Sequence, residues 1–274
     1  MALLGANGSG KTTAMEILCG LRLPTSGRAE FLGQPVVPGG AHRNWMGVQL
    51  QVGGLPQRLR VREALKAAEC LYRDAGDVDV IIDALGLRSR MSQMVDKLSG
   101  GWQRRLDIAI ACIGSPRLLV LDEPTSGLDP VARTALWEFL RDRRSKGVAV
   151  LTSTHDLAEA ETYADRLLVL DEGRAILRGP VSEVLSAAGG DHRLRVLSGD
   201  PGCVSAIRAQ GHTPLEAGSA ISVIGDSGGL TALREKLERL RDAGEVKFSD
   251  VLLGSVRLED VFAFAAASRK KETT

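Results

Sequence analysis

The sequence predicts an α/β protein: a main domain built on a mainly parallel sheet, followed by a small α+β domain. The first observation is a glycine-rich turn at residues 5–12 that opens an apolar helix directly after the short strand Met1–Leu4. The second is a change in composition at residues 186–191, "SAAGGD", typical of a domain boundary. The third is a set of strands without polar alternation, typical of a parallel sheet buried on both faces. These strands are Leu118–Leu121, Val148–Ser153 and Arg166–Leu170.

The first half of the main domain alternates short strands with helices. Met15 and Leu18 lie on the apolar side of the helix that follows the glycine-rich turn. "LPTSGRAEFLG" indicates a turn and a short strand, and "WMGVQLQ" (45–51) indicates another strand. From Val61 to about Ile113 the apolar residues recur with helical spacing, which predicts an inserted helical subdomain at about 61–113.

The second half contains the long helix "PVARTALWEFLRDRRSKG" (130–147), which should end at Gly147. Beyond the boundary we expect a strand, a helix, a second strand and a second helix with one leucine stripe. These are Arg193–Leu197, Val204–Gln210, Ala220–Ile224 and residues 230–244. The predicted domains are therefore residues 1–186 and 192–265, with a tail at 266–274.

Composition excludes several classes of protein. The chain has 274 residues, 44% hydrophobic and 25% charged, with a formal net charge of +1, so nothing suggests a nucleic-acid partner. No apolar run approaches the roughly 20 residues that span a bilayer. The four cysteines are far apart, which argues against zinc and against a disulfide framework. We expect them to be core thiols: Cys19, Cys70, Cys112 and Cys203.

The glycine-rich turn predicts a phosphate-binding loop and therefore a P-loop NTPase core. Gly5-Ala6-Asn7-Gly8-Ser9-Gly10-Lys11-Thr12 fits the pattern G-x-x-x-x-G-K-[ST]. Glycines allow backbone N–H groups to surround an anion, and the following helix points its positive dipole end at the same place. Lys11 should reach the β- and γ-phosphates of a nucleotide, and the Thr12 hydroxyl should ligate Mg²⁺.

The strand "LLVLDEP" (118–124) ends in two adjacent acids. In a parallel sheet the carboxyl ends of the strands face the ligand crevice, where the phosphate loop also lies. We expect Asp122 to hold the shell of the metal ion and Glu123 to polarise a water molecule against the γ-phosphate.

Three further segments follow in order: "LSGGWQRR" (98–105), "SGLDP" (126–130) and "STHD" (153–156). Together with the phosphate loop and the acidic strand end, they resemble the ATP-binding subunit of an ABC transporter over Leu3 to about Leu185. The resemblance implies ATP and Mg²⁺ as cofactors. It also implies a head-to-tail homodimer with two ATP molecules between the subunits.

The resemblance also assigns roles to individual residues. It implies Glu123, His155 and Gln51 as catalytic residues, and Thr12, Gln51 and Asp122 around the metal ion. Ser99, whose side chain should cap the following helix, joins Gly100 and Gly101 at the γ-phosphate of the partner subunit, and Asp129 links the two sites. The phosphate loop consists of Gly5, Ala6, Asn7, Gly8, Ser9, Gly10, Lys11, Thr12 and Thr13.

Position 102 departs from the resemblance, because many relatives carry Gln there. Trp102, Leu106 and Ile110 fall on one helical stripe, so we expect Trp102 to have a packing role.

The last third resembles ATPases of ABC-2-type drug and antibiotic exporters, through "VRLEDVFAFAA", "GVQLQVGGLP" and "STHDLAEAE". This resemblance implies a cytoplasmic subunit, peripheral on the plasma membrane, that hydrolyses ATP for a separately encoded permease exporting an amphipathic compound. Two alternatives stay open. One is a truncated fragment with impaired nucleotide binding. The other is a soluble ABC ATPase of translation or DNA repair, although the chain has neither a long coiled coil nor two cassettes.

The start of the chain carries an expectation of its own. Relatives have two strands and an adenine-stacking aromatic before the phosphate loop, whereas only ten residues precede Lys11 here. A strand usually runs about five or six residues, so we expect Met1 to be an internal position, with the true start roughly 25 to 35 codons upstream.

Overall fold

The computed structural model describes residues 1–50, 54–72 and 75–264. The chain forms two compact units: Met1–Asp156 with Leu168–Leu177, and Leu157–Leu167 with the residues from Arg178 onward. This division differs from the predicted boundary near residue 186, because α6 (Leu157–Tyr163) and α7 (Val181–Ser186) group with the C-terminal residues. One reason is a hydrogen bond of 2.9 Å from the Leu258 backbone N–H to the Glu161 side chain on α6.

The main sheet has six strands in the order β4-β5-β6-β1-β7-β8. β4, β5, β6 and β1 pair in parallel, as predicted, and the pair Asp122↔Ser153 joins the ends of β5 and β6. The short strand predicted within "LPTSGRAEFLG" is β2, which pairs with β3 in a hairpin, and β3 and β8 extend the predicted set. The bounds are β1 Ala2–Leu4, β2 Glu30–Phe31, β3 Gln34–Pro35, β4 Met46–Gln49, β5 Leu118–Asp122, β6 Ala149–Ser153, β7 Arg166–Asp171 and β8 Arg174–Pro180.

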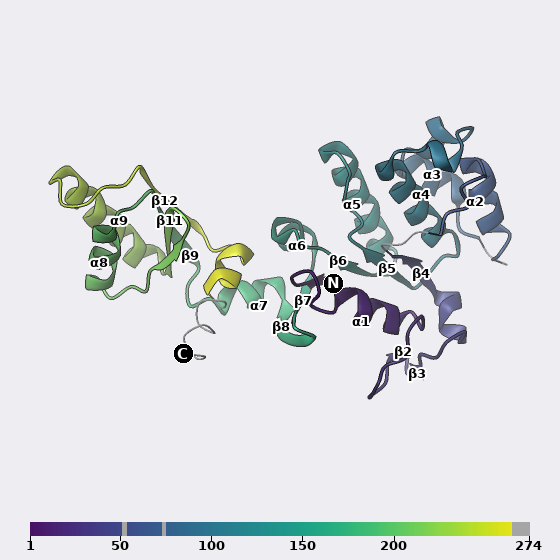
Figure 1. Ribbon diagram of the computed structural model, residues 1–274, viewed down its shortest axis with the longest axis horizontal. Helices are drawn as coiled ribbons and strands as arrows, with labels where there is room; N and C mark the ends of the chain where they lie inside the picture. Colours follow the sequence, from purple (N-terminus) through teal and green to yellow (C-terminus); the bar gives the residue numbers. More distant parts are fainter. Residues whose placement is uncertain (51–53, 73–74, 265–274) are drawn as a thin grey trace. The chain divides into compact units, whose positions relative to one another are not determined.

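Helices cover both faces of this sheet. In Figure 1, α1 (Lys11–Leu18) lies below the strands, and α4 (Gly100–Ile113) and α5 (Pro130–Ser145) lie above them. On the α1 side, Met15 packs with Val120 and Leu151 in one buried cluster. On the other side α4 lies so close to β4 that a Cβ at Gly47 would stand 1.9 Å from the Ala111 carbonyl oxygen.

The predicted helical insertion is present between β4 and β5. It contains α2 (Val61–Glu69), α3 (Val78–Ala84) and α4, with single turns η2 (Leu87–Arg90) and η3 (Val95–Lys97). A 3-10 turn, η1 (Ala41–Trp45), precedes β4. The helices gather at one end of the first unit (Figure 1). α4 therefore starts in the insertion and runs back to the sheet.

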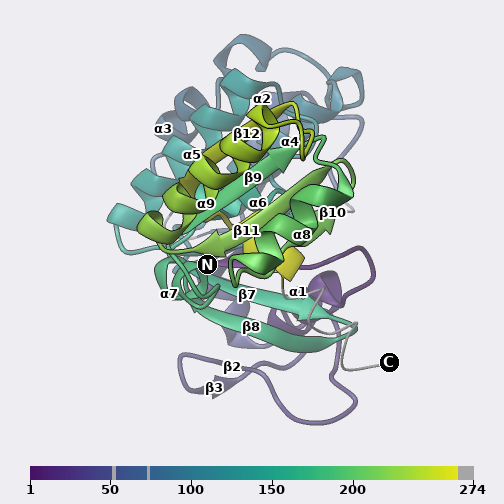
Figure 2. The ribbon, with the colours of Figure 1, turned by 90° about the vertical axis from the view of Figure 1, so that its left-hand side faces the viewer.

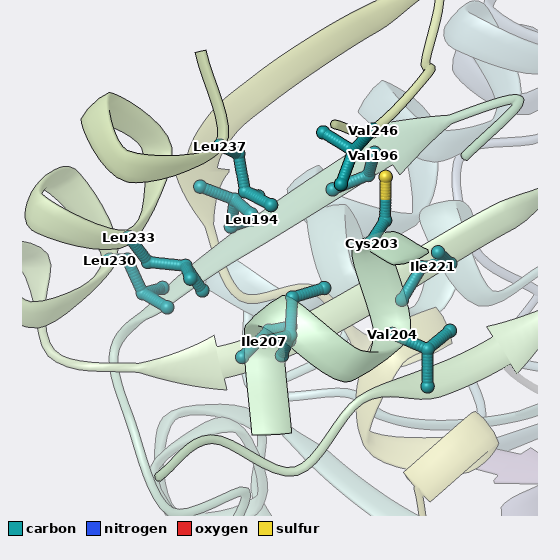
Figure 3. Close-up of a cluster of buried hydrophobic side chains, with 11 residues drawn as sticks. Leu194, Val196, Cys203, Val204, Ile207, Ile221, Leu230, Leu233, Leu237 and Val246 are labelled. Carbon is teal, nitrogen blue, oxygen red and sulfur yellow. The ribbon is translucent and has the colours of Figure 1, made fainter. Parts of the chain in front are cut away.

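The second unit contains a four-stranded antiparallel sheet in the order β10-β11-β9-β12. The two helices that connect its strands, α8 and α9, lie on one face of this sheet, as Figures 1 and 2 show, which makes a βαββαβ arrangement. The core between them joins apolar residues of α8 and α9 to β9 and β11 (Figure 3). The bounds are β9 His192–Leu197, α8 Pro201–Ala209, β10 Leu215–Ala217, β11 Ala220–Gly225, α9 Ser227–Asp242 and β12 Asp250–Ser255.

The cysteines follow the prediction with one exception. Cys19, Cys112 and Cys203 are buried, but Cys70 is exposed at the end of α2, so its assignment to the core was wrong. The helix ends there, and the thiol lies beyond its buried stripe. Within the described part of the chain, no helix has the length and apolar character needed to cross a membrane.

Candidate functional site

The phosphate loop has a backbone that only glycine adopts freely. Gly8 and Gly10 have φ values of 82° and 99°, in the left-handed region. A Cβ at Gly5 would stand 2.3 Å from the Leu170 carbonyl oxygen and 2.4 Å from Ser9 Oγ. The loop is therefore pressed against the end of β7, which fixes its position at the edge of the sheet.

Lys11 lies at the centre of the loop and is only 7% exposed. Its ammonium donates to the carbonyl oxygens of Gly5 at 2.8 Å and Ala6 at 3.0 Å. Because both acceptors are neutral, the positive charge is available to an anion in the adjoining cavity of about 280 Å³. That cavity is lined by Asn7, Gly8, Gly10, Lys11, Thr12, Thr13, Asp122 and Glu123. Loop geometry, charge and cavity together fit the phosphates of a nucleotide.

The two predicted metal ligands that the structure describes lie beside this cavity. Thr12 Oγ1 donates to Asp122 Oδ2 at 3.2 Å, although 110 positions separate them. Asp122 is 2% exposed, and its other carboxylate oxygen accepts from the Ser153 hydroxyl. Hard oxygen donors on one side of a phosphate-sized cavity are the donor set that Mg²⁺ prefers, so the residues fit the metal ion. The third predicted ligand, Gln51, lies outside the described residues.

The two predicted catalytic side chains meet at the same edge. His155 Nδ1 lies 3.0 Å from Glu123 Oε1. Glu123 has φ of 48°, a left-handed conformation that is uncommon for residues other than glycine. Its backbone N–H donates to Ser153 Oγ at 2.9 Å, which holds this conformation in place. Strained residues of this kind are frequent at functional sites.

Sequence reasoning missed three residues that position these groups. Ser153 links Asp122 to Glu123, Gln49 donates its amide to the Asp122 carbonyl oxygen at 3.4 Å, and Arg104 donates to the same oxygen at 3.3 Å. The sequence did carry a signal for Ser153, because this residue is the last of the predicted strand Val148–Ser153. In the sheet it lies directly beside Asp122. Gln49 and Arg104 become neighbours of Asp122 only through tertiary packing.

The "LSGG" segment begins α4 at a distance from this cavity. Ser99 occupies the N-cap position, but its side chain makes no capping hydrogen bond, so the predicted cap was wrong. Ser99 is exposed to solvent. Ser99, Gly100, Gly101 and Asp129 are not among the residues that line the cavity, as far as the structure describes them.

Trp102 packs against neighbouring side chains, as expected, but they are not apolar. Among the three residues of the predicted stripe, Leu106 is fully buried, whereas Trp102 and Ile110 are only partly buried. The Trp102 ring instead lies against two guanidinium groups, those of Arg90 and Arg105.

Comparisons with known proteins agree with this geometry. The family "ABC transporter" matches residues 1–126. The chain is 38% identical over 206 residues to Nod factor export ATP-binding protein I of Rhizobium etli, covering 73% of this chain and 65% of that protein. It is 37% identical over 205 residues to the protein of the same name from Burkholderia orbicola, covering 73% and 67%. The chain thus spans about two thirds of the length of these relatives.

Solved structures described as parts of ABC transporters have a similar fold. A structure described as the ATP-binding subunit of an ABC transporter superposes with a TM-score of 0.63 at 30% identity, covering 68% of this chain and 80% of that one. The cbiO1 protein from Clostridium perfringens, described as part of the ABC transporter complex cbiONQ, superposes with a TM-score of 0.58 at 28% identity, covering 68% and 78%.

Proposed function

Because this chain belongs to the family of ABC transporter ATP-binding proteins, we propose that it binds and hydrolyses MgATP as the energy-coupling subunit of an exporter. The observation that carries the proposal is the convergence of Lys11, Thr12, Asp122 and Glu123 on one cavity. Phosphoryl transfer requires mainly positioning and charge neutralisation, which these residues supply.

Each residue has a defined part in this proposal. The loop Gly5–Thr13 holds the phosphates through its backbone N–H groups and Lys11. Thr12 and Asp122 hold Mg²⁺, which neutralises phosphate charge when bound, and Gln51 completes that set. Glu123 accepts a proton from the attacking water, and His155 lies at hydrogen-bonding distance from its carboxylate, where it orients the carboxylate and the water.

The proposed assembly is a homodimer with ATP between the subunits. Ser99 and Gly100 are exposed and do not line the cavity of their own subunit. Asp129 is also largely exposed. Exposed backbone N–H groups at the start of a 14-residue helix favour a phosphate, and the partner's nucleotide supplies one.

Export is supported by the names of the relatives, which are ATP-binding proteins of Nod factor export. We place this chain at the cytoplasmic face of a membrane, beside a separately encoded permease. The permease contacts the transported compound and therefore determines which compound is exported.

Glu123→Gln tests the assigned chemistry. The amide cannot accept the proton, so turnover should fall by about a hundredfold or more, the usual contribution of a general base. ATP affinity should change little, because the amide keeps the size of the side chain. Phosphate release measures the first quantity and equilibrium binding of labelled ATP the second. The control is Glu138→Gln, on the exposed face of α5. Hydrolysis at the wild-type rate in the Glu123 variant would remove that residue from its role.

A further inference from the structure

Trp102 stands directly after the "LSGG" segment, and its ring lies against two cations. The Arg105 guanidinium lies 4.4 Å from the ring centroid and the Arg90 guanidinium 4.9 Å. Both distances are within the range of cation–π attraction. The edge of the ring also faces the turn at Gly86, where a Cβ would lie 3.8 Å from the indole. The ring therefore points into the helical insertion.

Arg105 is the group that this ring positions. Its side chain is 17% exposed, and one N–H donates to the Leu85 carbonyl oxygen at 3.3 Å. Its other terminal nitrogen lies 3.9 Å from Asp129 Oδ2. One planar guanidinium thus contacts the end of α3, the Trp102 ring and the start of α5. A guanidinium suits this place because it stacks and forms ion pairs at the same time.

Asp129 contacts Arg105 and also caps its own helix, α5. Its Oδ1 accepts from the Ala132 N–H at 2.9 Å, which caps α5, and its Oδ2 faces Arg105. The two segments also touch through their backbones. A Cβ at Gly101 would lie 3.2 Å from the Gly127 carbonyl oxygen and 3.3 Å from Leu128 Cδ2. The "LSGG" and "SGLDP" segments are therefore packed as one surface.

We infer that Trp102 and Arg105 are positioning residues that hold the "LSGG" segment and Asp129 in a fixed relative position. The ring restricts the guanidinium, and the guanidinium holds Asp129 beside the start of α4. Because both segments face the partner's nucleotide in the proposed dimer, this restraint sets the rate of hydrolysis without contributing to ATP binding in the monomer. The consequence for hydrolysis rests on the proposed function, whereas the restraint itself does not.

The variants separate the cation–π contact from simple packing. Trp102→Phe keeps a ring for the guanidinium, and Trp102→Leu keeps apolar volume but no ring. The matched control is Trp45→Leu, because Trp45 also carries a guanidinium, that of Arg117, at 4.4 Å from its ring. Trp45 ends η1, before β4, and does not line the phosphate cavity.

The first measurement needs no nucleotide. Hydrogen exchange of the Ala132 amide reports how firmly Asp129 holds the start of α5. Trp102→Leu should speed this exchange by about 5- to 30-fold, the size expected from losing a partly desolvated cation–π contact. Trp102→Phe should stay within about threefold of the wild type, and Trp45→Leu should match it. Unchanged exchange in Trp102→Leu, or an equal effect of both leucine variants, would overturn the inference.

The second measurement compares turnover with ATP binding. Trp102→Leu should lower kcat by about 5- to 30-fold and leave the ATP affinity of dilute monomer within about twofold. An equal loss in the Phe and Leu variants, or an equal loss of monomer affinity, would contradict the positioning role. A wild-type chain that neither binds nor hydrolyses ATP would refute the proposed function instead, and hydrogen exchange would still decide the restraint.

Discussion

At the scale of single residues, Ser153 joins the two halves of the site. Its hydroxyl donates to Asp122 and accepts from the Glu123 N–H. Thr12 contacts the same carboxylate from one side, and His155 contacts Glu123 from the other. The metal-binding and catalytic groups are therefore fixed relative to each other by one fully buried hydroxyl.

Ser153→Ala tests this link. It leaves a buried carboxylate oxygen and a partly buried N–H with one partner fewer, which should lower the free energy of unfolding by about 1–3 kcal/mol. Turnover should fall by about tenfold and ATP affinity by less, because the hydroxyl orients Glu123 without lining the phosphate cavity. Ser186→Ala is the control, since that hydroxyl donates to the Ser182 carbonyl oxygen on an exposed helix face. Equal stability and turnover in the Ser153 variant would contradict the proposed link.

At the scale of elements, α4 carries a partly buried acid, Asp107. Burial raises the pKa of Asp107 to about 6, and the nearby Arg104 offsets this only in part. When folding raises the pKa of a carboxyl, the folded chain is more stable with that carboxyl protonated than with it ionised. Ionised Asp107 therefore lowers the free energy of unfolding. This loss is absent below about pH 4 and grows as the pH rises through 6.

Asp107→Asn should consequently stabilise the chain at pH 8 by about 1–2 kcal/mol, a value reduced for partial solvent screening. The gain should vanish near pH 4, where Asp107 is protonated in the folded chain. Denaturant unfolding at both pH values measures the difference, with Glu138→Gln as the exposed control. An equal gain at both pH values would show that the effect does not come from ionisation.

The elements also show what the sequence can predict. β5 and β6 were predictable because their apolar runs reflect burial on both faces, and Gly147, with φ of 89°, ends α5 as expected. β8, "RAILRGP", was not, because it is partly polar and lies at the edge of the sheet. The contacts of Trp102 could not be predicted from the sequence, for another reason. Periodicity predicts which face of α4 the ring occupies, but not that Arg90 reaches it from a separate turn.

At the scale of the whole molecule, the family and the fold class are confirmed, and the C-terminal motif "VRLEDVF" has a structural role. Arg193 on β9 donates to both carboxylate oxygens of Asp260 at 3.0 and 2.9 Å. Asp260 is buried and also accepts from the Arg257 N–H. The motif therefore ties the segment after β12 to the sheet of the second unit.

Arg193→Met should destabilise the second unit by about 3–5 kcal/mol, because it leaves Asp260 buried without its cation. Replacing both residues, as Arg193→Met with Asp260→Leu, should recover most of that loss. Hydrogen exchange of β9 and β12 amides measures the effect within this unit. Arg195→Met, two positions along the same strand, should destabilise the second unit by less than Arg193→Met does. A double variant no more stable than Arg193→Met would contradict this account.

The central claim is that the loop Gly5–Thr13 of this chain holds the phosphates of ATP, and equilibrium binding of MgATP to Lys11→Ala tests it most directly. The variant removes the only loop cation that adjoins the cavity, so the affinity should fall by about a hundredfold, the value of one charged hydrogen-bonding group. Lys66→Ala, on the exposed face of α2, should bind ATP as the wild type does. Equal affinities of Lys11→Ala and wild type would contradict the claim.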